Sequence, residues 1–145
     1  MRLIKILIVS VLLSAVAYVF FARVLIHIPM DTVEKYRQMR SDMNGILGQG
    51  GLVIFSKESE RGSAALIMVS VDSRSVDEKL LAAYRDTFAS QEWRVIDSSS
   101  QKISYCKEGV LATLNLVPEW FPGKRMSVYG LTMEYNSGAT ADCKQ

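Results

Sequence analysis

The stretch that decides the fold is Ser75–Asp97, which reads SVDEKLLAAYRDTFASQEWRVID. Apolar side chains recur in it at every fourth position: Val76, Leu80, Tyr84 and Phe88. Charged residues occupy the opposite side, so this spacing predicts an amphipathic helix that lies on a sheet and ends near Ser90. Ser75 and Glu78 have the spacing of a capping box at its start. A strand begins directly afterwards at Trp93, whose side chain we expect in the core.

Working outward, polar turns separate six predicted strands, at residues 52–57, 64–71, 93–97, 102–106, 110–117 and 128–135. The first two form a hairpin through the polar turn 58–63. A second helix over residues 31–48 precedes them all, with Asp31 and Glu34 at capping-box spacing. The order α-β-β-α-β-β-β-β predicts an α+β domain with two helices on a largely antiparallel sheet.

The N-terminal segment is apolar and predicts a membrane span. No charged residue occurs from Ile6 to Ala22, and as a helix this run would be roughly 25 Å long. If Lys5 snorkels, residues 3–28 can cross the ~30 Å of a bilayer core. We therefore expect residues 1–29 to be a transmembrane anchor and residues 30–145 to form one small exported domain.

A cleaved signal peptide is the alternative for the same segment. Its n-region and h-region would be residues 1–5 and 6–14, and Ala15-Val16-Ala17 fits the cleavage pattern. The apolar run continues past Ala17, which favours the uncleaved anchor. Basic residues before the span favour a cytoplasmic N-terminus in the inner membrane. Either way, the domain is expected in the periplasm or outside the cell.

Charge argues against nucleic acid as a partner. The chain has 17 Lys and Arg and 15 Asp and Glu residues. Three of the basic residues, Arg2, Lys5 and Arg23, flank the predicted span, which leaves 14 basic against 15 acidic residues in the domain. No cluster of basic residues with interleaved aromatics is present, and binding to a phosphate backbone needs one.

Two cysteines, Cys106 and Cys143, predict one disulfide in an exported domain. Together with the single histidine, His27, they are too few for a structural zinc site. His27 lies where the predicted span leaves the membrane, so no serine or cysteine nucleophile has an evident base. No phosphate-binding or nucleophile-elbow motif occurs. We therefore predict a protein without enzymatic activity, cofactor or metal.

The segment between the last two predicted strands carries the candidate binding residues. Two large aromatics stand between prolines and are followed by two cations: Pro118, Trp120, Phe121, Pro122, Lys124 and Arg125. Prolines stiffen a loop and lower the entropy lost on docking, and Trp, Phe and Arg often anchor interfaces. The loop could hold a protein partner or reach lipid headgroups. Alternatively, Trp120 and Phe121 could fold back over the open end of the core.

Three functional hypotheses follow from this sequence. The first is a single-pass membrane-anchored envelope protein whose exported domain binds a protein partner, as an accessory or adaptor component. The second is an immunity-type protein that neutralises a toxin arriving in the periplasm. The third is a hydrolase with paired carboxylates, which requires two carboxyls within ~10 Å and a raised pKa on one of them.

Overall fold

The computed structural model describes residues 11, 13–19 and 31–144. From residue 31 onward the elements are α2 (Thr32–Leu47), β1 (Val53–Arg61), β2 (Ala64–Asp72), the 3₁₀-helix η1 (Ser73–Ser75), α3 (Glu78–Ser90), β3 (Arg94–Ser98), β4 (Lys102–Lys107), β5 (Val110–Asn115), β6 (Glu119–Phe121), β7 (Met126–Tyr135) and α4 (Ser137–Asp142). Within the described ranges, no helix combines the length and apolar character needed to cross a bilayer. Most of the predicted span, residues 3–28, lies outside the described residues.

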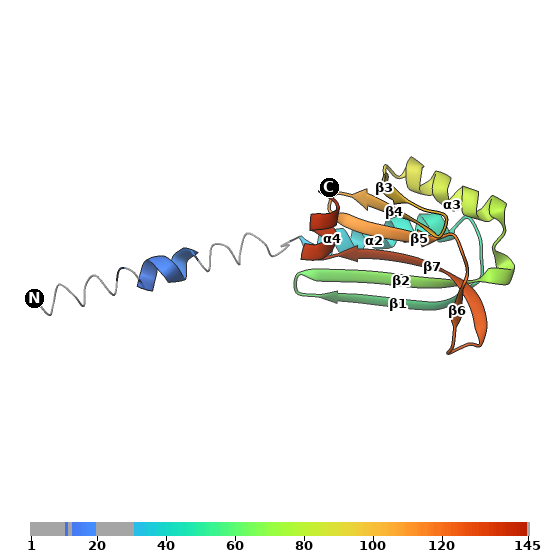
Figure 1. Ribbon diagram of the computed structural model, residues 1–145, viewed down its shortest axis with the longest axis horizontal. Coiled ribbons are helices and arrows are strands. Elements are labelled where there is room, and N and C mark those ends of the chain that lie inside the picture. The colour runs from blue at the N-terminus through green and yellow to red at the C-terminus, as the bar shows by residue number, and fades with distance from the viewer. Residues whose placement is uncertain (1–10, 12, 20–30, 145) are drawn as a thin grey trace, which may run out of the picture.

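One antiparallel sheet joins the seven strands of the described chain, in the order β1-β2-β7-β5-β4-β3 (Figure 1). β7 lies in the middle and is the longest strand. Along one edge it pairs with β2, from Ala65↔Tyr135 to Asp72↔Val128. Along the other edge its first residues, Met126–Val128, pair with β6, and its later residues, Leu131–Glu134, pair with β5. The predicted α+β class and the antiparallel sheet are confirmed.

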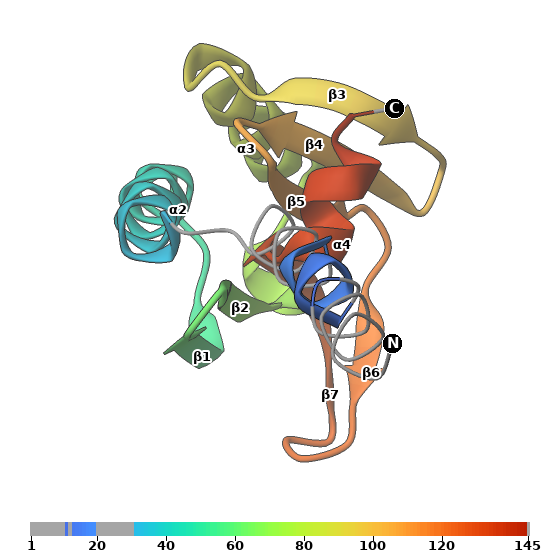
Figure 2. The same ribbon diagram turned by 90° about the vertical axis from the view of Figure 1, so that its left-hand side faces the viewer.

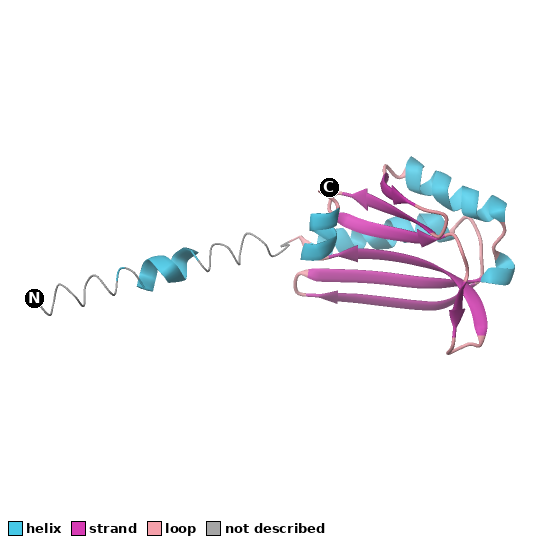
Figure 3. Ribbon diagram, viewed as in Figure 1, coloured by secondary structure: helices cyan, strands magenta, loops and turns pink. Residues whose placement is uncertain are grey.

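Both long helices cover one face of this sheet, and the strands curve around α2 (Figures 2 and 3). Alternate residues of β2 from Ala65 to Val71, and of β7 from Leu131 to Tyr135, are buried on this face, where they meet apolar side chains spaced three or four apart on the helices. The core includes Met39, Met43, Ile46, Ile67, Val69, Val71, Leu81, Tyr84, Phe88, Leu131 and Met133. No long helix of residues 31–144 covers the opposite face of the sheet.

The start of α3 differs from the predicted capping box. Asp77, not Ser75, is the N-cap residue, and its carboxylate accepts a hydrogen bond from the Leu80 N–H at 2.7 Å. Ser75 lies one turn earlier in η1, where its hydroxyl donates to the Asp72 carbonyl at 2.7 Å. The helix therefore begins at Glu78. Two cap-forming residues compete at this site, and the sequence alone does not rank them.

The start of α2 is held by tertiary contacts instead of the predicted capping box with Glu34. Asp31 occupies the N-cap position without a side-chain cap bond. Its carboxylate accepts a hydrogen bond from the Tyr135 hydroxyl at the end of β7. Burial and this bond raise the pKa of Tyr135 to about 12. One turn later, the Lys35 ammonium donates to Glu108 at 2.6 Å.

The sheet is larger than predicted. β1 continues through residues 58–61, which the sequence assigned to a turn, because this edge strand keeps its polar side chains exposed. β5 ends at Asn115 instead of Val117. Neither β6 nor α4 was predicted. α4 is short, and the Asn136 side chain caps it by accepting from the Ala139 N–H at 2.9 Å.

Trp93 is buried, as predicted, with 4% of its surface exposed. Its ring packs edge-on against Phe88, with centroids 5.7 Å apart. Its indole N–H donates to the Asp42 carboxylate at 3.0 Å, and the Lys107 ammonium donates to the same carboxylate at 2.9 Å. A partly buried ion pair therefore joins α2 to β4 next to the Trp93 ring.

Candidate functional site

The predicted binding loop is a β-hairpin built from β6 and the first residues of β7. Glu119 pairs with Val128, Trp120 with Ser127 and Phe121 with Met126. The Asn115 side chain donates to the Glu119 carboxylate at 3.0 Å and so ties the start of β6 to the end of β5. The aromatic segment is thus held in place by the backbone ladder of the sheet.

The two aromatics of the hairpin lie on opposite sides of it, because adjacent strand residues point to opposite faces. Phe121 is half-buried and packs against Phe55 of β1, with ring centroids 5.6 Å apart. Trp120 is 63% exposed. The alternative in which both rings fold back over the core is therefore wrong for Trp120, whereas Phe121 has an aromatic packing partner.

The hairpin turn presents its two cations to solvent. The Lys124 N–H bonds to the Phe121 carbonyl at 3.2 Å, and the Arg125 N–H bonds to the Pro122 carbonyl at 3.3 Å. Arg125 adopts φ 51°, a left-handed conformation that costs a non-glycine residue roughly 1–2 kcal/mol. Both side chains are exposed. A turn with glycine at this position would avoid the strain but would lack the guanidinium.

A hollow of ≈ 450 Å³ lies between the hairpin turn and the end of β2. Its polar lining consists of Asp72, Ser73, Arg74, Lys124, Arg125 and Ser127. Asp72 is buried and pairs with the Arg74 guanidinium, at 2.7 Å to Nη2. The hydrogen bonds from Arg74 lower the pKa of the Asp72 carboxyl. The site therefore holds three cations around one carboxylate that already has its partner.

This hairpin lies at the end of the sheet opposite the start of α2 (Figure 1). The chain enters the domain at residue 31, next to the β1–β2 turn and α4, whereas the hairpin projects beyond the other end of the strands. Trp120 and the cation-lined hollow thus share the end of the sheet opposite the start of α2. The structure brings all four predicted binding residues, Trp120, Phe121, Lys124 and Arg125, onto this one hairpin.

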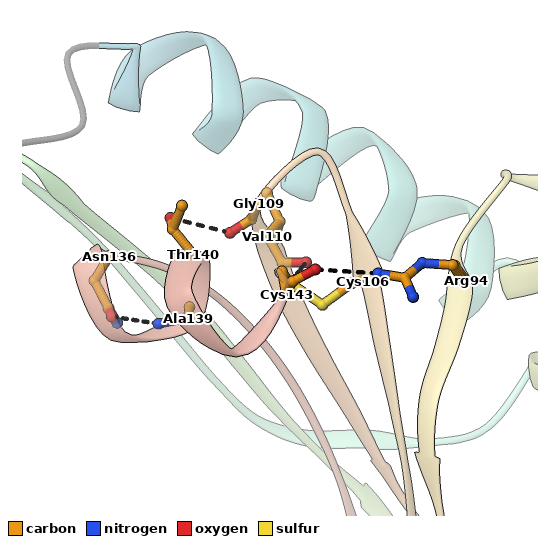
Figure 4. The surroundings of a disulfide bond; sticks show 8 residues. All are labelled: Arg94, Cys106, Gly109, Val110, Asn136, Ala139, Thr140 and Cys143. Carbon is orange, nitrogen blue, oxygen red and sulfur yellow. Dashed lines mark hydrogen bonds between the residues drawn. A yellow bond between two sulfur atoms is a disulfide. The ribbon is translucent and has the colours of Figure 1, made fainter. Parts of the chain in front are cut away.

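The predicted disulfide partners are at bonding distance, and the bridge holds α4 against the sheet (Figure 4). Cys106 on β4 joins Cys143 after α4, with 5.6 Å between their Cα atoms and a sequence separation of 37. The Arg94 guanidinium donates to the Cys143 carbonyl at 3.1 Å. The Thr140 hydroxyl donates to the Gly109 carbonyl at 3.4 Å. The C-terminal segment is therefore fixed at the end of the domain where the chain enters.

Carboxylates also gather on the open face of the sheet. A hollow of ≈ 370 Å³ is lined in part by Asp97, Glu134 and Asp142. Within the described residues, no group of three or more His, Cys, Asp or Glu side chains could hold a metal ion. The carboxyl pKa shifts that the structure resolves are downward, at Asp72 beside Arg74 and at Glu108 beside Lys35.

Two residues of this site were missed by sequence reasoning. Asp72 and Arg74 lie far from the hairpin in sequence, between a predicted strand and a predicted helix, although their i, i+2 spacing permits a local ion pair. Only the register between β2 and β7, in which Asp72 faces Val128, brings them beside Arg125. Comparison with protein-family models, with curated proteins and with solved structures found no match to this chain.

Proposed function

We propose that this chain is a membrane-anchored envelope protein whose exported domain binds a protein partner, as an accessory or adaptor component. The observation that carries the proposal is the exposure of Trp120, 63%, on a hairpin that the sheet holds in place. Trp is among the residues that most often form the energetic centre of a protein interface. A Trp on a preformed strand also loses little conformational entropy on docking.

The arrangement of the domain supports this role. With an anchor before residue 31, the start of α2 would face the membrane and the β6–β7 hairpin would point away from it (Figure 1). An aromatic at that end is in a position to meet another protein, whereas the headgroups of the anchoring membrane would lie at the other end. The proposal therefore prefers a protein partner to lipid for Trp120.

The Cys106–Cys143 bridge supports an exported location for the domain. Disulfides persist in oxidising compartments and are rare in the cytosol. A bridged cysteine pair that fixes α4 to β4 therefore fits a periplasmic or extracellular domain. An immunity-type protein would occupy the same compartment, and the identity of the captured partner separates that role from an adaptor role.

Site-specific photocrosslinking tests the proposal. The full-length chain is expressed in its native membranes with Trp120 replaced by photoreactive p-benzoylphenylalanine, and separately with Val95 replaced. Val95 is a matched control because it is 53% exposed and lies on β3, at the other side of the sheet. We expect one discrete protein adduct from position 120 and none from position 95. The same pattern from both positions, or lipid adducts alone, would refute a protein-binding hairpin.

A further inference from the structure

The cation-lined hollow beside the hairpin has a strong charge imbalance. Arg74, Lys124 and Arg125 surround it, and the single carboxylate among its lining residues is Asp72. Among the ion pairs of the described residues, none involves Lys124 or Arg125. The hollow thus carries an excess of about two positive charges, although the 14 basic and 15 acidic residues of the whole domain nearly balance.

Asp72 orients one of these cations without removing it from the surface. Its two oxygens accept three hydrogen bonds from the Arg74 side chain, at 2.7–3.1 Å, and one from the Arg74 N–H at 3.0 Å. The Asp72 side chain is 4% exposed, whereas the Arg74 side chain is 80% exposed. The guanidinium is therefore fixed in direction while most of its surface faces solvent. A preorganised guanidinium suits recognition of a carboxylate.

We propose that this hollow binds the carboxylates of an acidic patch on the partner protein, while Trp120 packs on an apolar spot beside that patch. The inference rests on the proposed function and names the chemistry of its partner. Ser127 lines the hollow and is the register partner of Trp120, so the cationic and aromatic parts of the surface are contiguous. An aromatic anchor with an adjacent cationic pocket gives both affinity and orientation.

Anionic lipid headgroups would satisfy the same cations, and the position of the hollow argues against them. The hollow lies at the hairpin end of the sheet, and the chain enters at the opposite end (Figure 1). A surface at this end meets the anchoring membrane only if the domain turns over. A soluble or neighbouring envelope protein reaches it directly.

The test combines the crosslink at position 120 with charge reversal. Lys124→Glu with Arg125→Glu should reduce the yield of the adduct at least tenfold. Lys79→Glu with Arg85→Glu is the matched control, because it reverses the same charges on the exposed surface of α3. Both variants should unfold at the denaturant concentration of the parent chain. A tenfold loss in the hairpin variant alone supports an acidic partner.

Defined probes identify the anion that the hollow prefers. The full-length chain, in nanodiscs of neutral phosphatidylcholine, is titrated with a labelled peptide of alternating Glu and Leu, and with a matched peptide of Gln and Leu. We expect the Glu peptide to bind at least tenfold more tightly, and the Lys124→Glu, Arg125→Glu variant to lose that preference. Equal binding of the two peptides would overturn the inference. So would tighter binding to phosphatidylglycerol vesicles, because it would assign the cations to lipid.

The two proposals fail in different ways. If position 120 gives no discrete protein adduct in the parent chain, a protein-binding hairpin is refuted and the acidic partner falls with it. If the adduct forms in equal yield with and without charge reversal, the hairpin still binds protein, but the acidic chemistry is wrong.

Discussion

The two tryptophans of this domain have opposite environments. Trp93 is 4% exposed, and its indole N–H donates to Asp42. Trp120 is 63% exposed, and the sheet holds its backbone while solvent surrounds its ring. Trp93 follows a helix that covers the sheet, whereas Trp120 lies on the hairpin that β6 forms with the first residues of β7. The comparison shows that the location of the strand in the fold, and not the residue type, decides whether a tryptophan is buried in the core or exposed to solvent.

The largest effect is expected at the buried tryptophan. Trp93→Ala should lower the free energy of unfolding by about 3–5 kcal/mol, because it removes a large buried ring and leaves a cavity beside Phe88. Chemical denaturation of the full-length chain in detergent measures this loss. Trp93→Phe is the control that keeps an aromatic ring but removes the N–H donated to Asp42, and it should cost less. A change below 1 kcal/mol for Trp93→Ala would mean that the two tryptophans do not differ as the structure shows.

The disulfide should come next. Reduction, or Cys106→Ser with Cys143→Ser, should cost about 3–4 kcal/mol, because the bridge closes a loop of 37 residues in the unfolded chain. Hydrogen exchange should show faster opening of α4 while the pairing of β2 with β7 stays protected. Unchanged exchange at Ala139 would show that α4 is held by its other contacts. Free thiols in protein isolated without reductant would contradict both the bridge and the exported location.

A smaller loss is expected at the ion pair beside Trp93. Lys107→Met should lower the free energy of unfolding by about 1–3 kcal/mol, because it leaves the partly buried Asp42 carboxylate with the indole N–H as its remaining side-chain donor. Lys102→Met is the matched control, since Lys102 lies exposed on the same strand. Urea denaturation of both variants gives the comparison. If Lys107→Met and Lys102→Met lowered the free energy of unfolding equally, the Asp42–Lys107 pair would stabilise the fold no more than an exposed lysine does.

How much of this contrast could be read from the sequence depends on the kind of contact. The periodicity of Ser75–Asp97 was enough to predict α3, the strand after it and the burial of Trp93, because a helix with one apolar side packs that side against the core of the domain. The disulfide was predictable because the chain has two cysteines. The exposure of Trp120 was not predictable. It depends on how β6 pairs with the first residues of β7, and a three-residue strand such as β6 has no periodicity of its own.

Tertiary contacts explain most of the remaining differences. Asp31 is of a residue type that often caps helices, but its carboxylate instead accepts a hydrogen bond from the Tyr135 hydroxyl, more than a hundred residues later in the chain. Residues 58–61 have the composition of a turn, but a free sheet edge tolerates such polar residues. The cationic hollow needs the ends of β2 and β7 side by side, and only the strand order supplies that.

The turn of the hairpin offers a test in the stabilising direction. Arg125→Gly should raise the free energy of unfolding by about 0.5–1 kcal/mol, because glycine adopts the left-handed conformation at φ 51° without steric cost. Lys124→Gly is the control, since Lys124 does not adopt a positive φ, and it should not stabilise. Thermal melts of the two variants give the difference. A loss of stability for Arg125→Gly would show that the guanidinium contributes more to the fold than the strain costs.

The smallest effect on stability is expected at the exposed tryptophan. Trp120→Ala should change the free energy of unfolding by less than about 0.5 kcal/mol, as is usual for surface substitutions. Partner capture should nevertheless fall by about 2 kcal/mol or more, the loss typical of an interface hot spot. Melting curves measure the first quantity, and the affinity for the partner identified by crosslinking measures the second. A drop in stability comparable to that of Trp93→Ala would show that Trp120 serves the fold instead.

The position of β7 in the sheet also sets the order in which the domain can be assembled. β7 pairs with β2, β5 and β6, yet it is synthesised after all of them. Until residues 126–135 emerge, the β1–β2 hairpin and the β3–β4–β5 meander have no strand between them, and each has an unpaired edge. The pairings of β2 with β7 join residues 56 to 70 positions apart, and such non-local contacts slow folding. If the domain is exported starting from its residue-31 end, it would therefore complete its sheet only after nearly all of it has been translocated, and the Cys143 thiol can reach Cys106 only after that.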